Sequence, residues 1–402
     1  MKILQINAIY GFSSTGKTAL ELNEALVENG HIGIAITTKS ISDRSEVYIM
    51  GSKLDWCLHG LLSRLFGLQG YFSTLSTKKL IKFINNEKPD IIHLRNLHAN
   101  YINLPMLLKH IAKNNIPTII TLHDCWFFTG KCCHYTADNC FKWTERCDNC
   151  PAQKKYNKSW FFDFSRKMFE DKQKLFGNIS NLTVVAVSDW LLHEVKKSPI
   201  FENADKIRIY NWIDTEKFVQ KNSSELKKQL GLEDKKILLC VAGGWTKEKG
   251  FETVIEISKK LNDNERILLV GIVYDKNLLN EKIINVPATE SVDELISYYS
   301  MADVFVQPSI QETFGKVVAE ALSCGTPAVC FSSTANPELV KDGCGASVQV
   351  GDVEAMLKEI RNILENGKGN YSNACRNFAV DNFNKEKNIK QYFDLYESIL
   401  GE

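Results

Sequence analysis

Strand-like and helix-like segments alternate along this chain, and that rhythm limits the folds open to it. Short runs rich in aliphatic and β-branched residues recur through the first half, at Ile3–Ala8, Gly33–Thr37, Asp90–Leu94, Pro117–Leu122 and Leu182–Val187. Longer, helix-like segments separate these runs. A β–α alternation of this kind is typical of a parallel, doubly wound sheet with helices on both faces.

The rhythm begins again after a connection near residues 190–205. Five more runs of the buried type follow, at Ile237–Ala242, Ile267–Val270, Ile283–Val286, Val304–Gln307 and Ala328–Phe331. The sequence therefore predicts two Rossmann-like α/β domains, an N-terminal one over residues 1–190 and a C-terminal one over residues 203–384. A final helix over residues 385–402 is free to pack on either domain.

Composition narrows the class of protein further. A length of 402 residues fits two or three domains, and 44% hydrophobic with 24% charged residues is ordinary for a globular protein. A formal net charge of +1 gives no reason to expect nucleic acid as a partner. Lys2 is followed by a strand-like run rather than an apolar leader, and no run of roughly 18 apolar residues suggests a membrane span. We therefore expect a cytoplasmic protein whose twelve cysteines are thiols or metal ligands.

Two carboxylates, Glu312 and Glu320, follow the strand-like run that ends at Gln307. The apolar stretch after Gly315 indicates a short helix that carries Glu320 and starts just after Glu312. The turn at Gly315 leaves backbone N–H groups at a positive helix end, which suits a phosphate. Because open α/β sheets bind ligands beyond the carboxyl ends of their strands, the pattern predicts a ligand with both phosphates and hydroxyls, such as a nucleotide sugar.

A second pattern predicts a different function. Residues Gly11–Thr18 (GFSSTGKT) match the P-loop pattern G-x-x-x-x-G-K-[ST] between a strand and a helix, so a P-loop nucleoside triphosphatase is an alternative. A minimal enzyme of that class has no use for a second α/β domain. We therefore expect the backbone near Gly16 to approach a ligand without forming a P-loop.

The stretch around the two glutamates resembles the paired-glutamate motif of the retaining, family-4-type glycosyltransferases with the GT-B fold. Further stretches along nearly the whole chain are similar to the same family: Thr121–Asp124, Val187-Ser188, Ile209–Asp214, Val241–Gly250, Ala302-Asp303, Cys324–Pro327 and Pro337-Glu338. Ser14–Lys17 and His123–Trp126, together with a cysteine cluster, resemble the bacterial branch that assembles capsule, colanic-acid-type and O-antigen polysaccharides.

This resemblance implies two Rossmann-like domains that face each other across a cleft. It also implies transfer of a hexose or N-acetylhexosamine from a UDP- or GDP-sugar to a saccharide acceptor, with retention of configuration. Attack would come from the same face as departure, and the departing phosphate oxygen would take the acceptor proton. No D-x-D motif stands in the expected context, so we expect no catalytic metal.

The resemblance further implies roles for individual residues. Glu320 is expected to hold ribose hydroxyls, and Glu312 to contact hydroxyls of the transferred sugar. Lys249 is expected to neutralise the diphosphate, and His123 to reach the donor sugar, with the adjacent Asp124 as a candidate base. Other donor contacts are expected from Gly16, Ser188, Asn211, Gly243, Gly244, Lys247, Thr313, Phe314, Gly315 and Lys316.

One position departs from the family pattern. The arginine that normally stands near the start of the lysine loop aligns with Gly244, which Trp245 follows. Lys247 and Arg208 are the candidates to supply the missing positive charge.

Five cysteines fall within nineteen positions of a predicted insertion over residues 125–155: Cys132, Cys133, Cys140, Cys147 and Cys150. Cys147-x₂-Cys150 has the spacing of a zinc knuckle, whereas Cys132-x₇-Cys140 is wider than usual. A structural zinc bound by Cys132, Cys140, Cys147 and Cys150 is one interpretation, in which His134 can replace a ligand. Unlinked thiols in an aromatic-rich loop and disulfides are the alternatives.

Two segments, residues 56–72 and 160–167, combine apolar and basic residues. Such segments can lie on a bilayer surface, and buried helix faces share the same composition. Contact with the inner membrane on its cytoplasmic side would indicate a lipid-linked saccharide as the acceptor. Arg95, Asn96 and His98, which follow the third strand-like run, are the expected acceptor contacts.

Two further functions compete with sugar transfer. A GT-B-type sugar-nucleotide epimerase would release or rearrange the sugar without an acceptor. A zinc-dependent interaction module would carry an inactive transferase domain.

Overall fold

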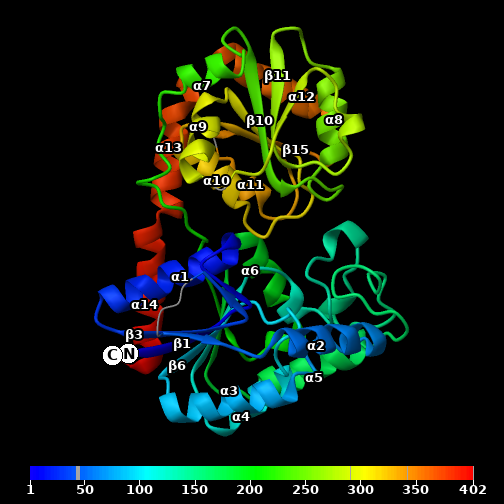
Figure 1. Ribbon diagram of the computed structural model, residues 1–402, viewed down its shortest axis with the longest axis vertical. Coiled ribbons are helices and arrows are strands. Elements are labelled where there is room, and N and C mark those ends of the chain that lie inside the picture. The colour runs from blue at the N-terminus through cyan, green and yellow to red at the C-terminus, as the bar shows by residue number, and fades with distance from the viewer. Residues whose placement is uncertain (42–45, 290, 342, 402) are drawn as a thin grey trace. The chain divides into compact units, whose positions relative to one another are not determined.

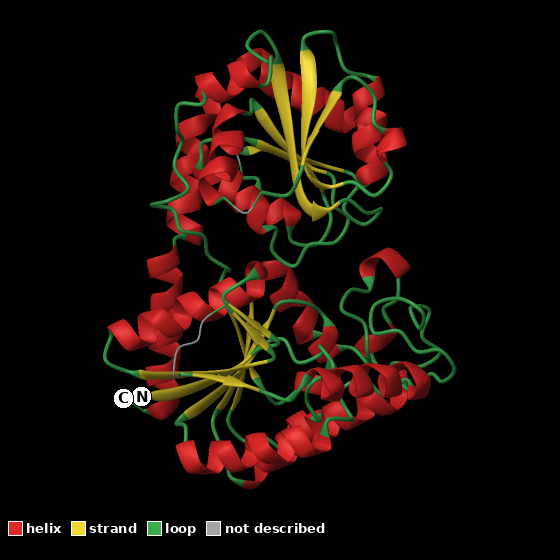
Figure 2. Ribbon diagram, viewed as in Figure 1, coloured by secondary structure: helices red, strands yellow, loops and turns green. Residues whose placement is uncertain are grey.

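The chain forms two α/β units, each built on its own parallel sheet (Figures 1 and 2). The computed structural model describes residues 1–41, 46–289, 291–341 and 343–401. The first unit runs from Met1 to Ile209 and includes the last helix from Ile389, and the second unit runs from Tyr210 to Asn388. The predicted α/β class, with parallel sheets in two domains, is confirmed.

The first sheet has seven parallel strands in the order β5-β3-β1-β6-β7-β8-β9. Their bounds are β1 Lys2–Ile6, β3 Ile32–Thr37, β5 Val47–Ile49, β6 Ile91–Leu94, β7 Thr118–Leu122, β8 Leu182–Ala186 and β9 Asp205–Arg208. The chain winds outward from β1 in one direction and then returns to build β6 on its other side. The strand order therefore reverses between β1 and β6, where doubly wound sheets bind their ligands.

Helices cover both faces of this sheet (Figure 2). They are α1 Ser13–Glu28, α2 Lys53–Phe66, α3 Thr74–Glu87, α4 Leu104–Lys113, α5 Ser165–Gly177, α6 Asp189–Lys196 and α14 Lys385–Leu400. Short elements complete the unit: β2 Ile9–Tyr10 paired with β4 Lys39–Ser40, and the 3₁₀ turns η1 Trp126–Phe128, η2 Thr136–Asp138, η3 Lys142–Thr144 and η4 Pro199–Phe201. Helix α4 shows how local sequence sets a helix start, because the Asn103 side chain accepts the Met106 N–H and Pro105 occupies the first turn.

The second sheet repeats the same winding with six parallel strands, in the order β12-β11-β10-β13-β14-β15. Its strands are β10 Lys236–Gly244, β11 Glu265–Ile272, β12 Ile283–Val286, β13 Val304–Gln307, β14 Ala328–Phe331 and β15 Gly345–Val348. Its helices are α7 Ser224–Gln229, α8 Phe251–Lys259, α9 Val292–Met301, α10 Lys316–Ser323, α11 Asn336–Leu339, α12 Val353–Asn366 and α13 Gly369–Phe383, with the 3₁₀ turn η5 Lys276–Leu278. The order reverses between β10 and β13, which places the predicted ligand site at the ends of these two strands.

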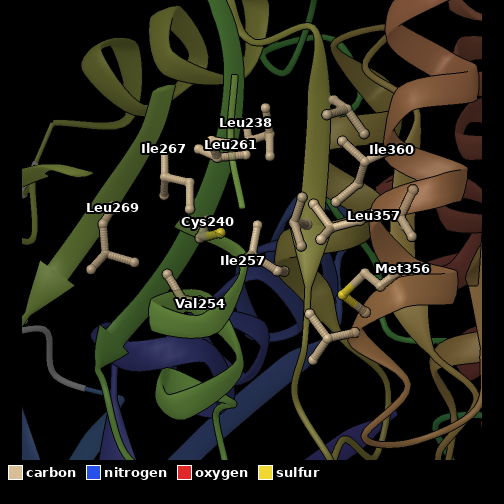
Figure 3. Close-up of a cluster of buried hydrophobic side chains, with 14 of the residues drawn as sticks. Leu238, Cys240, Val254, Ile257, Leu261, Ile267, Leu269, Met356, Leu357 and Ile360 are labelled. Atoms are coloured by element: carbon tan, nitrogen blue, oxygen red, sulfur yellow. The ribbon is translucent and has the colours of Figure 1, made fainter. Parts of the chain in front are cut away.

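A continuous apolar core lies between one face of the second sheet and helices α8 and α12 (Figure 3). The labelled side chains come from β10 (Leu238, Cys240), β11 (Ile267, Leu269), α8 and the turn that follows it (Val254, Ile257, Leu261) and α12 (Met356, Leu357, Ile360). On each strand these residues alternate with residues of the opposite face, as the period of a strand requires. This packing fixes α8 against β10 and so fixes the loop that joins them.

The two units divide the chain differently from the boundaries expected from sequence. Residues 205–208, expected within the second domain, form β9, which pairs in parallel with β8 of the first sheet. The last helix also contributes to the first unit, where the Tyr392 and Tyr396 hydroxyls lie within hydrogen-bond distance of Thr121 and His93. The first helix begins earlier than expected, at Ser13 rather than Thr18.

Candidate active site

Three loops at the carboxyl ends of β10, β13 and β14 are joined by hydrogen bonds into one scaffold. The carbonyl of Glu248, in the loop after β10, accepts from the Ile310 N–H at 3.0 Å and the Ser309 hydroxyl at 3.2 Å, both in the loop after β13. Asn336, beyond β14, donates its side-chain amide to the carbonyl of Ser309 at 3.0 Å. The Ser333 hydroxyl likewise donates to the Ile310 carbonyl at 2.7 Å. Side chains on these loops are therefore held by backbone contacts, not only by their own rotamers.

Lys249 and Glu312 meet on this scaffold. The Lys249 Nζ lies 2.6 Å from the Glu312 Oε1, and the Gln307 side-chain amide donates to the same oxygen at 3.1 Å. The Glu312 N–H donates to the Thr334 hydroxyl at 2.9 Å, which fixes the backbone from which the carboxylate projects. The Lys249 side chain remains 40% exposed, so its ammonium is accessible to an anionic ligand.

Two glycines let these loops approach one another. Gly250 has a φ of 78°, and a Cβ there would lie 2.1 Å from the Pro308 carbonyl oxygen, so only glycine fits between the loops. Gly315, with a φ of 89°, is the N-cap of α10. The predicted turn, short helix and stop at Gly325 are thus all present.

Glu320 lies on α10 and is 8% exposed. The hydroxyl of the fully buried Tyr299 donates to its Oε2 at 2.8 Å. Burial, followed by the neighbouring Glu320 carboxylate, raises the pKa of Tyr299 well above its ordinary value, so this phenol stays a donor. Phe314, one residue before the cap, is buried against Phe383 at a ring-centroid distance of 5.2 Å. Glu320 is therefore held in place by the protein core rather than lying in bulk solvent.

A tyrosine side chain lies beside Gly244, the position at which the family pattern has arginine. Gly244 ends β10, and a Cβ there would lie 3.0 Å from the hydroxyl of Tyr274, whose side chain is 75% exposed. Arg208, one candidate for the missing charge, pairs with Asp189 of the same unit at 3.1 Å. Lys247 is exposed on the loop that carries Lys249. Gly243 is exposed near the end of β10, and Asn211 is buried after β9. Thr313 and Lys316 are half-buried on either side of the α10 cap.

In the first unit, a polar cluster lies beyond the ends of β6 and β7. The His98 Nε2 and the Asp124 Oδ2 are 2.6 Å apart, and the Cys133 Sγ lies 3.8 Å from the same nitrogen. The other Asp124 oxygen accepts the Trp126 N–H at 2.8 Å. Within the described residues, these three form the group whose possible metal-ligating atoms all lie within 4.8 Å of one another. Half-buried His123 precedes Asp124 at the strand end.

Electrostatics favours an ionised pair in this cluster. Burial opposes the charged form of His98, yet the carboxylate of Asp124 and the thiol of Cys133 raise its pKa well above the ordinary value. Burial likewise opposes ionisation of Asp124, but His98 and the Trp126 N–H lower its pKa. The geometry is suited to orienting a hydroxyl or holding a proton, not to binding phosphate.

Four residues predicted to contact ligands make contacts inside the first unit. Arg95, 1% exposed, donates to Gln5 at 3.1 Å and Thr18 at 3.3 Å. The buried hydroxyl of Ser188 caps α6 by accepting the Leu191 N–H at 3.1 Å. Gly16 packs against backbone, since a Cβ there would lie 3.3 Å from both the Gly11 nitrogen and the Ile9 carbonyl oxygen. The N–H of Asn96, also expected to contact the acceptor, donates to the Asn7 side chain at 3.2 Å.

The P-loop pattern does not form a phosphate cradle. Helix α1 already begins at Ser13, so most of the residues that would wrap a phosphate are helical. The Thr18 hydroxyl, which would bind Mg²⁺ in a P-loop, is buried and donates to the Thr15 carbonyl at 3.0 Å. The structure therefore argues against the nucleoside triphosphatase alternative.

Several partners in these sites carry no signal in the sequence. Gln307 and Thr334 hold Glu312, Tyr299 holds Glu320, and Cys133 joins His98. Each of these contacts depends on which way a side chain points after folding. For Tyr299 the only clue in the sequence is its place in helix α9, which precedes strand β13.

Among the described residues, no helix combines the length and apolar character that crossing a bilayer requires.

Comparisons with known proteins agree with the geometry. A family model described as "Glycosyltransferase Family 4" matches residues 15–217, and one described as "Glycosyl transferases group 1" matches residues 222–381. N-acetyl-alpha-D-glucosaminyl L-malate synthase of Bacillus anthracis is 26% identical over 241 residues, which cover 56% of this chain and 62% of the relative. The capsular polysaccharide biosynthesis glycosyltransferase CapM of Staphylococcus aureus is 26% identical over 237 residues, which cover 54% of this chain and 62% of the relative.

A solved structure shows the fold. The crystal structure of HepE from Anabaena, in complex with UDP and glucose, superposes with a TM-score of 0.66 at 16% identity and covers 99% of this chain and 100% of that one. The predicted GT-B fold is confirmed by likenesses of this kind. Family models match both halves of the chain, and the paired glutamates lie on one scaffold. This chain therefore belongs to the family-4 glycosyltransferases.

Proposed function

We propose that this glycosyltransferase moves a hexose or N-acetylhexosamine from a UDP- or GDP-sugar to a saccharide acceptor, with retention of configuration. The observation that carries the proposal is the meeting of Lys249 and Glu312 at the ends of β10 and β13, beside the N-terminus of α10. A cation and a helix N-terminus suit a diphosphate, and two held carboxylates suit sugar and ribose hydroxyls.

The chemistry follows from where charge develops. Breaking the sugar–phosphate bond leaves an oxocarbenium-like sugar and a nucleoside diphosphate anion, and preorganised donors on that anion lower the barrier. Lys249 and the α10 N-terminus supply those donors, while Glu312 and Glu320 position the sugar and the ribose. The departing phosphate oxygen takes the acceptor proton, so no protein base is required in the donor site.

The resemblance to a capsular enzyme supports a role in surface polysaccharide assembly. The UDP complex of HepE supports a uridine nucleotide first, with guanosine as the alternative. In the first unit, the pairing of His98 with Asp124 is suited to orienting an acceptor hydroxyl.

An apolar surface of the first unit supports a lipid-linked acceptor. Leu54, Leu58 and Leu61 are exposed on one face of α2 at the spacing i, i+4, i+7. The exposed aromatic segment 160–162 is attached to the same helix, because the Trp160 N–H donates to the Arg64 carbonyl at 2.7 Å. Exposed lysines at 154 and 158 precede this segment. Apolar side chains with basic neighbours suit an anionic bilayer, so we place the reaction at the cytoplasmic face of the membrane.

A melting-temperature panel tests the donor site. UDP, GDP, UDP-glucose, UDP-N-acetylglucosamine and GDP-mannose are added in turn, and we expect ligands of one base to raise the melting temperature because they bind only the folded protein. Lys249→Ala should abolish that shift, while Lys259→Ala, on the exposed side of α8, should keep it. If none of these nucleotides shifts the wild-type protein, the proposal is wrong.

Transfer is tested separately, with the stabilising donor carrying a labelled sugar. The label should enter chloroform–methanol-extractable material when bacterial membranes are supplied, and Glu312→Gln should prevent this. Release or rearrangement of the sugar without membranes would instead indicate an epimerase-type activity. Full transfer by Glu312→Gln would mean that the paired-glutamate motif is not used.

A further inference from the structure

The segment between β7 and α5, residues 123–164, is unusually long for a connection without sheet or α-helix. All of its residues are described, and its regular structure consists of the 3₁₀ turns η1, η2 and η3. Its own small core is aromatic: the Trp143 ring lies 5.0 Å from Phe128 and 4.9 Å from Tyr135. Loops longer than about 15 residues in compact domains usually have a functional or structural reason.

Four cysteines of this segment surround one small cavity. Cys132, Cys140, Cys147 and Cys150 all contribute to its lining. The Cys132 and Cys150 sulfurs are 3.9 Å apart. Four thiolates at about 2.3 Å from a tetrahedral zinc stand roughly 3.8 Å from each other, whereas a disulfide would bring two sulfurs to about 2.05 Å. The Cys132–Cys150 pair has the zinc spacing, but the four sulfurs are not all within 4.8 Å of one another, so Cys140 and Cys147 must move closer to complete the site. His134 lies outside this lining, beside the Tyr156 ring.

We propose that Cys132, Cys140, Cys147 and Cys150 bind one structural Zn²⁺, and that this site fixes the position of the neighbouring Cys133 beside His98 and Asp124. The proposal is independent of the sugar-transfer reaction.

Hydrogen bonds hold two of the four cysteines at the cavity. The Gly130 N–H donates to the Cys147 sulfur at 3.2 Å, and N–H groups of this kind stabilise metal-bound thiolates. A Cβ at Gly130 would lie 3.0 Å from the Cys147 Cβ and 2.5 Å from the Ser165 carbonyl oxygen, so glycine is required for this approach. The Cys150 N–H is held in turn by the Asp163 carboxylate at 2.6 Å.

Charge near the cavity also fits a thiolate complex. Four thiolates and one Zn²⁺ carry a net charge of −2, which is costly to bury unless cations lie close. Lys131 and Lys172 are 2% and 3% exposed, and within the described part of the chain neither ammonium lies within 4.0 Å of a carboxylate. Lys131 lines the cavity, and the Lys172 ammonium donates to the Thr129 carbonyl at 3.0 Å, one turn before the first cysteine. Lys131 therefore borders the cavity and Lys172 lies near the chain that leads into it, where a cation would offset part of the charge of a thiolate complex.

The adjacent cysteine faces another group of side chains. Cys132 contributes to the cavity, whereas the Cys133 sulfur lies 3.8 Å from the His98 Nε2. His98, Asp124 and Cys133 are themselves a conceivable metal group. However, the 2.6 Å between the His98 nitrogen and the Asp124 oxygen is a hydrogen-bond distance, and ligands about 2.0–2.1 Å from one tetrahedral zinc would stand roughly 3.3 Å apart. We therefore assign the metal to the four-cysteine cavity.

Metal content measured on the full-length protein, purified under reducing conditions, separates the two groups. Native mass spectrometry and elemental analysis of the wild type should give about one zinc per chain. Cys140→Ser and Cys147→Ser should lose it, while Cys133→Ser and His98→Gln, changed in the neighbouring group, should keep it. Nucleotide-induced stabilisation should persist in all four variants, because the donor site lies in the other unit, and this checks that the second unit of each variant is folded.

A measurement on the unmodified chain covers the case in which the cysteine variants fail to fold. Co²⁺ exchanged into the wild type should give the strong thiolate-to-cobalt absorption of a four-sulfur site. Three outcomes would overturn the proposal: a metal-free protein after growth with added zinc, a disulfide between Cys132 and Cys150 in the reduced preparation, or zinc that survives Cys147→Ser and disappears in Cys133→Ser.

Discussion

The two units share one sheet winding but position their functional side chains by different means. In the second unit, Lys249 and Glu312 project from short loops that are tied together by backbone hydrogen bonds. In the first unit, His98 and Asp124 lie against Cys133, which belongs to a segment of about forty residues with little regular structure. Functional side chains at equivalent strand ends can therefore be held in place either by closely packed loops or by an added subdomain.

The two units also differ in the ionisable side chains that they contain. All eight histidines lie in the first unit, between His31 and His193, so side chains that ordinarily titrate near neutral pH are confined to it. The second unit places lysine and glutamate at its site. The lysine and glutamate of the second unit suit the proposed donor, which carries fixed negative charge. The histidines of the first unit suit the proposed acceptor hydroxyl.

The strongest test of this difference between the units is to remove one member of the Lys249–Glu312 pair and one member of the His98–Asp124 pair. We expect Glu312→Gln or Lys249→Ala to lower the rate of sugar transfer by about 10²-fold or more, since each removes a group aligned with developing charge. Asp124→Asn should cost about 10-fold, because a positioned acid–base group contributes less when phosphate takes the proton. Steady-state kinetics with the preferred donor measures both values.

The matched control is Glu252→Gln on the exposed first turn of α8, which should leave the rate unchanged. If Asp124→Asn were the more damaging change, the acceptor side would control the chemistry, and Lys249 and Glu312 would not be its main determinants.

The next largest effect is expected in the pH dependence of stability, through the buried His59 of the first unit. Burial, only partly offset by Asp55, lowers the pKa of His59 to about 4, and its Nε2 accepts the Gly70 N–H at 3.2 Å, which requires the neutral ring. The unfolded chain takes up a proton near pH 6.5 and the folded chain only near pH 4, so stability falls as pH drops across that window. We expect a loss of about 2–3 kcal/mol between pH 6.5 and pH 4 from this residue.

Urea unfolding of the wild type and of His59→Gln, each at pH 7 and pH 4.5, checks this expectation. The variant should be less stable at pH 7 and should show a flatter dependence on pH. An equally steep dependence in the variant would assign the effect to another group.

A backbone substitution tests how tightly the loops of the second unit are packed. Gly250→Ala should lower the free energy of unfolding by about 2 kcal/mol or more, because it adds a Cβ at a positive φ against the Pro308 carbonyl. Gly243→Ala, near the end of β10 with nothing within 4 Å of its Cβ, should change it by less than about 0.5 kcal/mol. Similar losses in both variants would mean that the close approach at Gly250 is not a constraint.

The smallest effect is expected at the apolar surface of the first unit. Leu58→Glu combined with Phe161→Glu should weaken binding to vesicles that contain anionic lipid by about 10-fold, as apolar area is lost and negative charge is added. Flotation assays measure this, with Leu278→Glu on the second unit, also exposed, as the control. Equal binding of wild type and variant would remove the support for a membrane surface.

Patterns that depend on local spacing were readable from the sequence. The alternation of strands and helices predicted both sheets, and the turn at Gly315 with its two glutamates predicted the placement of Glu312 and Glu320 around α10. Such features follow from backbone periodicity and from residues with restricted φ, which act over a few positions.

Other features depend on which way a side chain points, and the sequence did not reveal them. Arg95 follows a strand and was expected at a ligand, yet it turns into the core between Gln5 and Thr18. Cys132 and Cys133 are adjacent but join different groups. The strand at 205–208 belongs to the first sheet because it pairs with β8, and only tertiary structure decides between the two available sheet edges.

In the donor site proposed above, the pairing of Lys249 with Glu312 would make donor binding an exchange of partners. An arriving diphosphate would compete with the carboxylate for the same ammonium group, and the displaced carboxylate would need hydroxyls to accept from. An anion that brings no hydroxyls, such as pyrophosphate, would leave Glu312 uncompensated and should bind poorly. On this proposal, the contact that neutralises Lys249 in the resting protein would also select against phosphates that carry no sugar.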